Sequence, residues 1–238
     1  MNTNMPLRNP KRIREMFSSI AHRYDKTNTY LSAGIHHLWR KKLVNMSKAK
    51  PGDSVLDCAT GTGDLAIAFK KCVGNSGHVI GTDFCPEMLA SAPAKAEKAG
   101  CPIRFEEADV TNLQFQDKRF DITSIAFGIR NVSYPIKALQ EMARVTKPGG
   151  SVMILEFGQP SLPVWKDIYF FYSHTLLPKI GGWLTGASDA YSYLEKSSAS
   201  FPCNEAFIQL CREADCFSEI EMKSLTGGVA YMYKARVR

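Results

Sequence analysis

The sequence predicts an α/β fold, in which helices cover both faces of one doubly wound sheet. Two observations predict it. A buried strand at residues 54–58 runs into a glycine-rich turn and then into a helix that begins at Asp64. Strand-like and helix-like segments then alternate along the chain, as a parallel sheet requires. At 238 residues the chain is long enough to bury a full core.

The first turn predicts a ligand site. Gly61 and Gly63 let the backbone turn sharply and let a ligand approach without meeting a Cβ. The free N–H groups of the following helix face this turn. The second strand, residues 78–83, ends at Asp83, about twenty residues after the glycines, where an acid can hold ribose hydroxyls. These features predict a nucleoside-containing cofactor at the carboxyl edge of the sheet.

Acidic residues distinguish between two such cofactors. Asp57 closes the first strand and Asp64 follows the turn, and both would repel the diphosphate of NAD. They would suit the sulfonium and ammonium groups of S-adenosylmethionine. Asp109 follows a third strand, residues 103–108, where its carboxylate could accept a hydrogen bond from the amino group of adenine. A single Asp can be a helix cap or turn residue, but three acids at successive strand ends favour S-adenosylmethionine.

The remaining elements continue the alternation. We expect strands at residues 120–126 and 151–155, and a helix at 135–146 that stops at the Lys-Pro-Gly-Gly segment 147–150. A helix at 205–214 and strands at 217–225 and 229–235 complete the fold. The last two strands flank Thr226 and two glycines, which predicts an antiparallel hairpin at the sheet edge. The total is seven strands.

Composition limits the location and the chemistry. Seven cysteines form no Cys-x-x-Cys pair, which argues against a disulfide framework or a zinc site and for a reducing cytosol. No cluster of metal ligands is visible, so no metal is expected. Residues 1–6 lack the apolar core of a signal peptide, and the longest uncharged aromatic run, 168–178, is too short to span a bilayer. The net charge of +7 has three interpretations: it keeps the protein soluble, it favours binding to an anionic membrane surface, or it favours binding to nucleic acid.

Residues 1–50 are predicted to form an N-terminal helical lid. Eleven Lys and Arg side chains precede the first strand, and apolar side chains recur at helical spacing: Ile13, Met16, Phe17, Ile20, Ala21 and Tyr24. This pattern predicts a basic amphipathic helix that either packs on the domain or lies on a membrane. Packing is favoured, because such stripes usually belong to a core.

A second appendage, residues 157–202, is rich in aromatic side chains: Trp165, Tyr169, Phe170, Phe171, Tyr172, Trp183, Tyr191 and Tyr193. Its place after the fifth strand predicts an apolar pocket or lid for a hydrophobic ring substrate. The alternative is a helical subdomain that buries these rings among themselves.

Over nearly its whole length the chain resembles the UbiE/MenG family of quinone C-methyltransferases, within the class I S-adenosylmethionine-dependent methyltransferases. The matching segments are 16–25 (MFSSIAHRYD), Asn28, 34–40 (GIHHLWR), 127–132 (FGIRNV), 144–150 (RVTKPGG), 155–157 (LEF), 174–178 (HTLLP) and 191–194 (YSYL). The Pro-Gly-Gly turn is common to many methyltransferases, whereas the Arg-Asn and N-terminal signatures are specific. The resemblance implies a Rossmann-like seven-stranded sheet, with residues 51–238 as the methyltransferase domain.

The resemblance also implies cofactor contacts. Thr62 and Asp83 would bind S-adenosylmethionine, and Asp109 with Val110 would flank its adenine. The chain departs from the family at Ala126, where relatives often carry Ser; the missing hydroxyl removes one hydrogen bond worth about 0.5–1.5 kcal/mol. The full predicted cofactor site is Asp57, Gly61, Thr62, Gly63, Asp83, Asp109 and Val110.

The implied reaction is methyl transfer to a ring carbon of a hydroquinone. A phenolate is a far better carbon nucleophile than a phenol, and ionising a phenol at pH 7 costs about 4 kcal/mol. We expect Arg130 to stabilise the phenolate oxygen and Asn131 to orient it. Tyr24 and Asp25 would complete the site from the lid, and Asp25 or His174 would take the proton. The alternatives are a structural salt bridge for Arg130 and a packing role for His174.

The expected substrate is a lipophilic quinol. We favour demethylmenaquinol; the alternative is 2-polyprenyl-6-methoxy-1,4-benzoquinol. A nucleic-acid methyltransferase is disfavoured, because Pro202-Cys203 precedes Asn and Glu rather than Gln and no Asn-Pro-Pro-Tyr tetrad exists. A further alternative is that the chain keeps the methyltransferase fold but acts as a non-catalytic scaffold that binds partner enzymes. We expect a cytoplasmic protein with transient contact to the inner face of the plasma membrane, no nucleic acid, and a homodimer or partners among quinone-biosynthesis enzymes.

Overall fold

The computed structural model of the protein describes residues 9–160, 163–172, 175 and 188–238. Within these residues seven strands form one sheet in the order β3-β2-β1-β4-β5-β7-β6. The strands are β1 (Ser54–Cys58), β2 (His78–Asp83), β3 (Arg104–Glu107), β4 (Phe120–Ala126), β5 (Thr146–Phe157), β6 (Phe217–Leu225) and β7 (Ala230–Val237). β7 runs antiparallel to both β5 and β6, and the other neighbouring strands are parallel. The predicted doubly wound sheet and its edge hairpin are confirmed.

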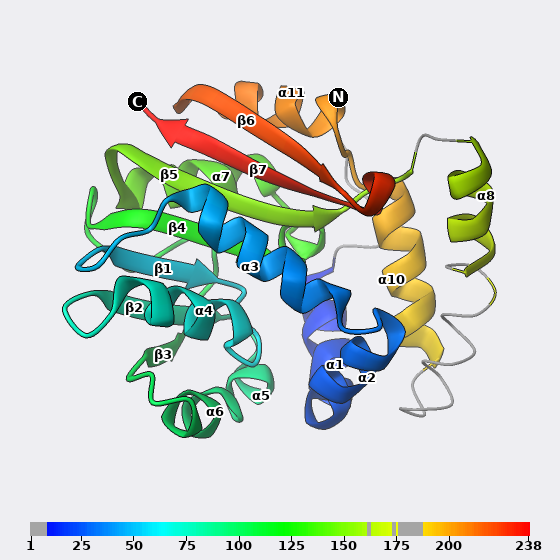
Figure 1. Cartoon of the computed structure of the whole chain (residues 1–238), viewed down its shortest axis with the longest axis horizontal. Helices are drawn as coiled ribbons and strands as arrows, with labels where there is room; N and C mark the ends of the chain where they lie inside the picture. The colour runs from blue at the N-terminus through cyan, green and yellow to red at the C-terminus, as the bar shows by residue number, and fades with distance from the viewer. Residues whose placement is uncertain (1–8, 161–162, 173–174, 176–187) are drawn as a thin grey trace.

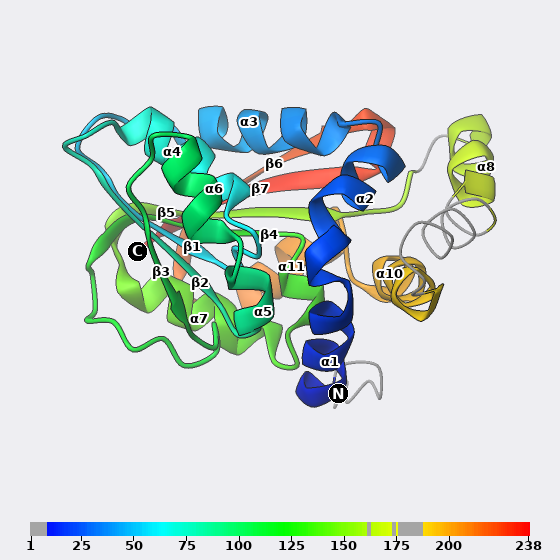
Figure 2. The ribbon, with the colours of Figure 1, turned by 90° about the horizontal axis from the view of Figure 1, so that it is seen from below.

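Helices lie on both faces of this sheet (Figures 1 and 2). α3 (Ile35–Ser47) and α4 (Asp64–Val73) cover one face, and α7 (Pro135–Val145) and α11 (Glu205–Glu213) cover the other. Leu43 of α3 and Phe69 of α4 are fully buried in one core layer, and Leu139 and Phe207 are fully buried in the opposite layer. Two short helices, α5 (Pro86–Leu89) and α6 (Ala92–Lys98), contact β3 near one sheet edge.

Two groups of helices lie beyond the carboxyl ends of the parallel strands. α1 (Pro10–Ile20), a 3-10 turn (Ala21–Arg23) and α2 (Tyr24–Leu31) form the first group, and α10 (Ser188–Ser200) and α8 (Pro163–Phe171) form the second (Figure 1). Ile20 is buried among Met16, Phe17, Tyr24 and Leu194. The N-terminal apolar stripe is therefore used in packing.

Several boundaries differ from the sequence-based expectation. The single N-terminal helix is broken by the 3-10 turn after Ile20. β5 begins at Thr146 rather than Ser151, because Thr146 pairs with Phe120 before a register shift that accommodates Pro148 and the glycines. α3 lies within the range of the predicted lid, yet Trp39 and Leu43 pack into the core beside the sheet.

No helix in the described ranges combines the length and the apolar character needed to cross a bilayer.

Candidate active site

The glycine turn joins β1 to α4 and is held by side chains from two strands. Gly61 and Gly63 have φ of 57° and 85°, a region that L side chains rarely adopt. A Cβ on Gly63 would also lie 3.0 Å from the Phe105 ring. The Thr60 backbone N–H donates to Thr82 O at 2.9 Å, which ties the turn to β2. The local sequence therefore fixes the turn as predicted.

Asp57, at the end of β1, lies beneath this turn. Its carboxylate accepts hydrogen bonds from Thr60 Oγ1 at 2.6 Å and from Ser124 Oγ at 2.7 Å. Burial raises the pKa of Asp57 to about 6, although both hydroxyls favour the charged form. Asp57 is 1% exposed and lies outside the lining of the cavity described next, so its geometry is that of a group that braces the turn.

Asp83, at the end of β2, faces a cavity of about 190 Å³, called here the first cavity. Asp83 Oδ2 accepts from the Gly61 N–H at 2.8 Å, and Oδ1 accepts from the Cys85 N–H at 2.9 Å. Burial raises the pKa of Asp83 to about 6, and the backbone donors oppose this shift. A carboxylate so placed can accept hydrogen bonds from ribose hydroxyls.

The first cavity joins the sheet edge to the N-terminal helices. Gly61, Asp83, Asp109 and Val110 line it, whereas the described geometry leaves Thr62 and Gly63 out of the lining. Asp109 is exposed and accepts from the Thr111 N–H at 2.8 Å, while Val110 is buried and gives an apolar wall. Further lining residues are Pro10, Phe17, Tyr24, Ala126, Phe127 and Asn131. A carboxylate, a backbone turn and an apolar wall together fit a nucleoside.

A network of ion pairs connects the lid to the glycine turn. Asp25 of α2 accepts from Thr62 Oγ1 and from Lys95 Nζ, each at 2.6 Å. Lys95 also contacts Asp64, and Arg40 Nη1 lies 3.2 Å from Asp64 Oδ2. Burial opposes ionisation of Asp64, but Arg40 and Lys95 outweigh it and lower its pKa. Asp25 is absent from the lining of both cavities described here.

This network corrects one step of the sequence-based argument. Asp64 was expected to face a cationic ligand, yet two basic side chains already neutralise it. The other two acids of that argument differ in position, because Asp109 lines the first cavity beside Asp83, whereas Asp57 braces the turn below it.

Replacing Lys95 with methionine is expected to loosen the lid, because it removes the cation shared by Asp25 and Asp64. Lys98→Met is the matched control, since Lys98 is an exposed residue of the same helix. Amide hydrogen exchange in α1 and α2 should be faster in Lys95→Met alone, by about three- to tenfold for a pair worth roughly 1 kcal/mol. Equal exchange in both variants would show that this network does not hold the lid.

A second, mostly apolar cavity of about 130 Å³ adjoins the first. Phe17, Tyr24 and Phe127 line both cavities. The second cavity is otherwise walled by aromatic side chains from α3, β5, α8 and α10: Trp39, Phe157, Tyr169, Tyr172 and Tyr193. Three rings of the predicted aromatic insertion thus face a cavity rather than one another. His174 and Trp183 lie outside the described residues.

Arg130 reaches the second cavity from the 3-10 turn Ile129–Asn131, and it is 5% exposed. Nη1 donates to Glu156 Oε1 at 2.8 Å and to Phe127 O, so the structural ion pair weighed in the sequence analysis is present. Its Cζ lies 5.3 Å from the centre of the Phe157 ring. Nε is buried and has no hydrogen-bond partner among the described residues. A buried, unpaired N–H of a cation is prepared to bind an oxygen anion.

Asn131 and Tyr24 complete the boundary between the cavities. Asn131 lines the first cavity and its Oδ1 accepts from Tyr193 Oη at 3.1 Å. Burial raises the pKa of Tyr24, although Arg40 and Arg130 favour its ionised form. The structure thus brings Tyr24, Arg130 and Asn131 together around Phe127.

His36 was missed by the sequence analysis, although the segment 34–40 carried part of the resemblance. It is 5% exposed and lines the second cavity. Ser32 Oγ lies 2.7 Å from Asn28 O, to which it can donate, and 2.5 Å from His36 Nδ1. When Ser32 donates to Asn28 O, it accepts the Nδ1–H of His36, and Nε2 then carries the lone pair. Burial, with Arg40 and His37, lowers the pKa of His36 to about 4, which keeps the ring neutral at pH 7. The helical spacing of His36, Trp39 and Leu43 was the signal available in the sequence that His36 lies on a buried helix face.

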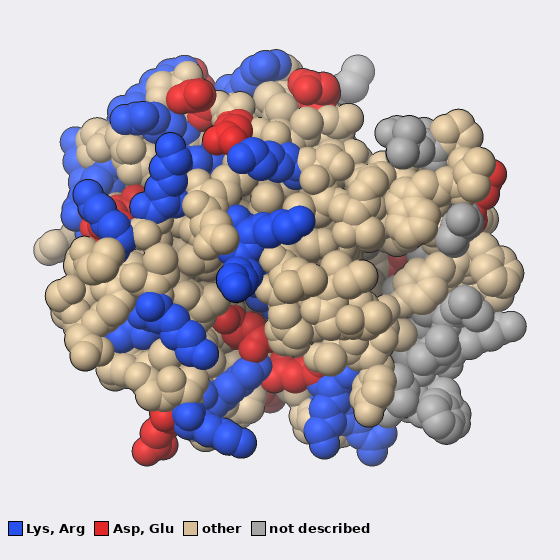
Figure 3. All heavy atoms as spheres, viewed as in Figure 1, with Lys and Arg blue, Asp and Glu red and all other residues tan. Residues whose placement is uncertain are grey.

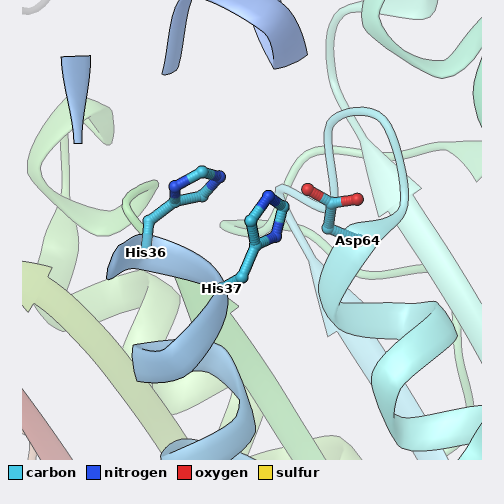
Figure 4. A group of neighbouring side chains, drawn as sticks. All are labelled: His36, His37 and Asp64. Atoms are coloured by element: carbon cyan, nitrogen blue, oxygen red, sulfur yellow. The ribbon is translucent and has the colours of Figure 1, made fainter. Parts of the chain in front are cut away.

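His36, His37 and Asp64 bring three potential metal-ligand atoms within 4.8 Å of one another (Figure 4). This cluster is not apparent in the sequence, because Asp64 follows the histidines by 27 residues or more. Both Arg40 and Lys95 contact the Asp64 carboxylate. Like charges about 4 Å apart repel by about 4 kcal/mol per unit charge at an effective dielectric constant of about 20. The charge environment therefore opposes a divalent cation here.

Comparisons with known proteins agree on one family and one fold. A model of the ubiE/COQ5 methyltransferase family matches residues 5–236. A ubiquinone/menaquinone biosynthesis C-methyltransferase UbiE from Bdellovibrio bacteriovorus is 62% identical over 97% of each chain. A demethylmenaquinone methyltransferase from Alkalihalophilus pseudofirmus is 38% identical over 94% of each chain.

Solved structures with the same fold are distant in sequence. A SAM-dependent methyltransferase from Thermotoga maritima superposes with a TM-score of 0.66 at 18% identity, over 94% of this chain and 99% of that one. A SAM-dependent methyltransferase from Aquifex aeolicus gives 0.58 at 19% identity, over 84% and 89% of the two chains.

Proposed function

From the premise that the chain belongs to the ubiE/COQ5 methyltransferase family, we propose that it methylates demethylmenaquinol to menaquinol. The general activity of this family, whichever quinol is used, is that of an S-adenosylmethionine-dependent C-methyltransferase of quinone biosynthesis. The observation that carries the proposal is the pair of adjoining cavities, which share Phe17, Tyr24 and Phe127. One has the groups that suit a nucleoside, and the other has the aromatic walls that suit a quinol ring.

The first cavity would hold the cofactor. Asp83 would accept hydrogen bonds from the ribose hydroxyls, and Val110 would pack on the adenine beside Asp109. Asp57, Thr62 and Gly63 would act indirectly, by holding the turn from which Gly61 reaches the cavity. When bound, S-adenosylmethionine supplies the methyl group of a sulfonium cation.

The second cavity would hold the quinol ring and stabilise its ionised form. The Nε–H of Arg130 would donate to the phenolate oxygen, in a site that excludes water and so strengthens the interaction. The Glu156 carboxylate fixes the guanidinium against Phe127 O, so little reorganisation is needed as charge develops. Asn131, held by Tyr193, would orient the same oxygen from the boundary between the cavities.

His36 is our candidate for the base that takes the proton of the quinol hydroxyl: with Ser32 accepting its Nδ1–H, the lone pair of Nε2 receives that proton as the phenolate forms. Asp25 has both oxygens engaged by Thr62 and Lys95, which suits it to holding the lid. His36→Asn is expected to lower kcat by about ten- to a hundredfold and to leave cofactor affinity unchanged. His37→Asn, a change of the exposed neighbouring histidine, is the control and should keep kcat. Equal kcat values for the two variants would remove His36 from the reaction.

The substrate assignment is tested by turnover of two tail-shortened quinols with the same enzyme. A naphthoquinol buries a second ring against the aromatic walls, which at about 25 cal/mol per Å² favours it by roughly 1 kcal/mol. We expect kcat/KM for the demethylmenaquinol analogue to exceed that for the methoxybenzoquinol analogue by about fivefold or more. A higher kcat/KM for the methoxybenzoquinol analogue would instead identify the benzoquinol as the substrate. If neither ring were methylated, the result would favour a non-catalytic scaffold.

A lipophilic substrate implies further partners. We propose transient contact with a membrane surface, where the polyprenyl tail resides, and no role for nucleic acid. A homodimer, or association with other quinone-biosynthesis enzymes, is proposed on the same basis and is tested by the mass of the protein in solution.

A further inference from the structure

Three helical segments wall the second cavity on one side and are exposed on the other. Leu31 at the end of α2, Trp39 of α3 and Tyr172, which directly follows α8, line the cavity. Tyr172 Oη donates to Leu31 O, which ties α8 to α2. The residue beside each in sequence is apolar and exposed: Tyr30 at 73%, Leu38 at 60% and Phe171 at 58%.

This alternation follows from helix geometry. Successive helical residues point about 100° apart, so one can face the cavity while its neighbour faces outward. The same short segments therefore carry the inner wall of the cavity and an apolar outer face. Tyr30, Leu38 and Phe171, with the exposed Lys26, Lys41 and Lys42, are called here the docking face.

The charge of the docking face is positive. α2 and α3 contain the exposed Lys26, Lys41 and Lys42, whereas their remaining charged side chains, Arg40 and Asp25, are paired with Asp64 and Lys95. In Figure 3 Lys and Arg side chains cross the middle of this side of the molecule, and a broad uncharged area lies beside them over α2, the start of α3 and α10. Apolar side chains bordered by lysines match an anionic bilayer, in which apolar groups enter the interface and lysines meet the headgroups.

We propose that the docking face binds an anionic phospholipid bilayer and so places the second cavity at the lipid surface. The inference rests on the proposed function, because the polyprenyl tail of the quinol must stay in lipid while its ring enters the protein. The N-terminal stripe does not serve this purpose, since Ile13 and Ile20 are buried within the protein.

Binding to vesicles of phosphatidylglycerol and phosphatidylcholine, measured by co-sedimentation, tests this proposal. The double variant Leu38→Gln/Phe171→Ser should bind about tenfold more weakly, because two apolar side chains no longer enter the interface. The variant Lys41→Gln/Lys42→Gln should also lose about tenfold, because each lysine near an anionic surface contributes several-fold. Lys118→Gln/Lys137→Gln, which changes two exposed lysines elsewhere, is the charge-matched control and should bind like the unaltered protein.

Turnover of a tail-less, water-soluble demethylmenaquinol analogue separates this proposal from the proposed function. Both docking-face variants should keep that turnover, while turnover of a long-tailed quinol in vesicles falls in parallel with binding. If both variants turn over the water-soluble analogue and also bind vesicles as the unaltered protein does, the proposed docking face is wrong but the proposed function stands. Loss of a dimer in Leu38→Gln/Phe171→Ser would instead identify this face as a contact between two copies and would also overturn the proposal. Absence of soluble turnover in the unaltered protein would overturn the proposed function itself.

Discussion

Replacing Arg130 with alanine is expected to lower kcat by about a hundred- to a thousandfold, the usual loss when one donor to a developing oxyanion is removed. The reason is the buried Nε–H, which has no partner among the described residues and borders the aromatic cavity. Arg130→Lys keeps the charge but loses the planar fork, so it should recover only part of the activity. Steady-state turnover with a short-chain quinol measures the effect.

Stability must be separated from chemistry in this experiment. Arg130→Ala leaves the Glu156 carboxylate buried and unpaired, which costs about 3–5 kcal/mol of unfolding free energy. The double variant Arg130→Gln/Glu156→Gln replaces the ion pair with two neutral amides, so that no buried charge is left without a counterion, and should recover much of that stability. It should remain as inactive as the single variant. A stable double variant with full turnover would remove Arg130 from catalysis and leave it a purely structural role.

Replacing Asp83 with asparagine is expected to weaken S-adenosylmethionine binding by about ten- to a hundredfold. Hydrogen bonds to a charged group contribute about 1.5–3 kcal/mol, and the amide of Asn cannot accept from the Gly61 N–H, the Cys85 N–H and a ribose at once. Asp121→Asn is the matched control, because Asp121 also accepts a backbone N–H, from Ser54, at the opposite end of a strand. Calorimetric titration should find the control unchanged; equal weakening in both would trace the loss to general destabilisation.

The raised pKa of Asp83 adds a pH dependence to this result. Because its pKa is about 6 before ligand binds, and a ribose needs the ionised form, affinity should be constant near pH 7–8 and fall below about pH 6. The fall approaches tenfold per pH unit. In Asp83→Asn this slope should shrink; if it stays, another group sets the pH dependence.

Fold stability should move in the opposite direction with pH. The pKa values of Asp57 and Asp83 are raised to about 6 from 3.8, so the folded state binds protons more tightly than the unfolded state. Their contribution to stability is fully present below about pH 4 and is lost as pH rises through about 6. Acidification from pH 7 should therefore weaken cofactor binding while these two groups stabilise the fold, a divergence that comparison of calorimetric and thermal-unfolding data would reveal.

Local signals account for what the sequence predicted well. β1, the glycine turn and α4 follow from a buried apolar run, two glycines at positive φ and the helical spacing of Leu65 and Phe69. The site at the strand ends follows from topology, since parallel neighbours β1 and β2 bring Asp57 and Asp83 to one edge. These features depend on residues close in sequence or on a fold rule.

Non-local pairing accounts for what was missed. Asp64 and Asp25 look alike in the sequence, and only the folded chain brings Lys95 to both of them and Arg40 to Asp64 across tens of residues. From the sequence, Glu156 was recognised only as part of a family motif. In the structure its pairing with Arg130, 26 residues away, fixes the position of the guanidinium. His36 and the break after Ile20 depend on which side of each helix the fold buries.

A crystal structure of the protein with S-adenosylhomocysteine and a tail-less quinone tests the central claim most directly. The account predicts the nucleoside in the first cavity against Asp83 and Val110, the ring in the second cavity against Arg130, and the sulfur near the shared residues Tyr24 and Phe127. A nucleoside bound away from Asp83, or a ring separated from Arg130 by the lid, would contradict it.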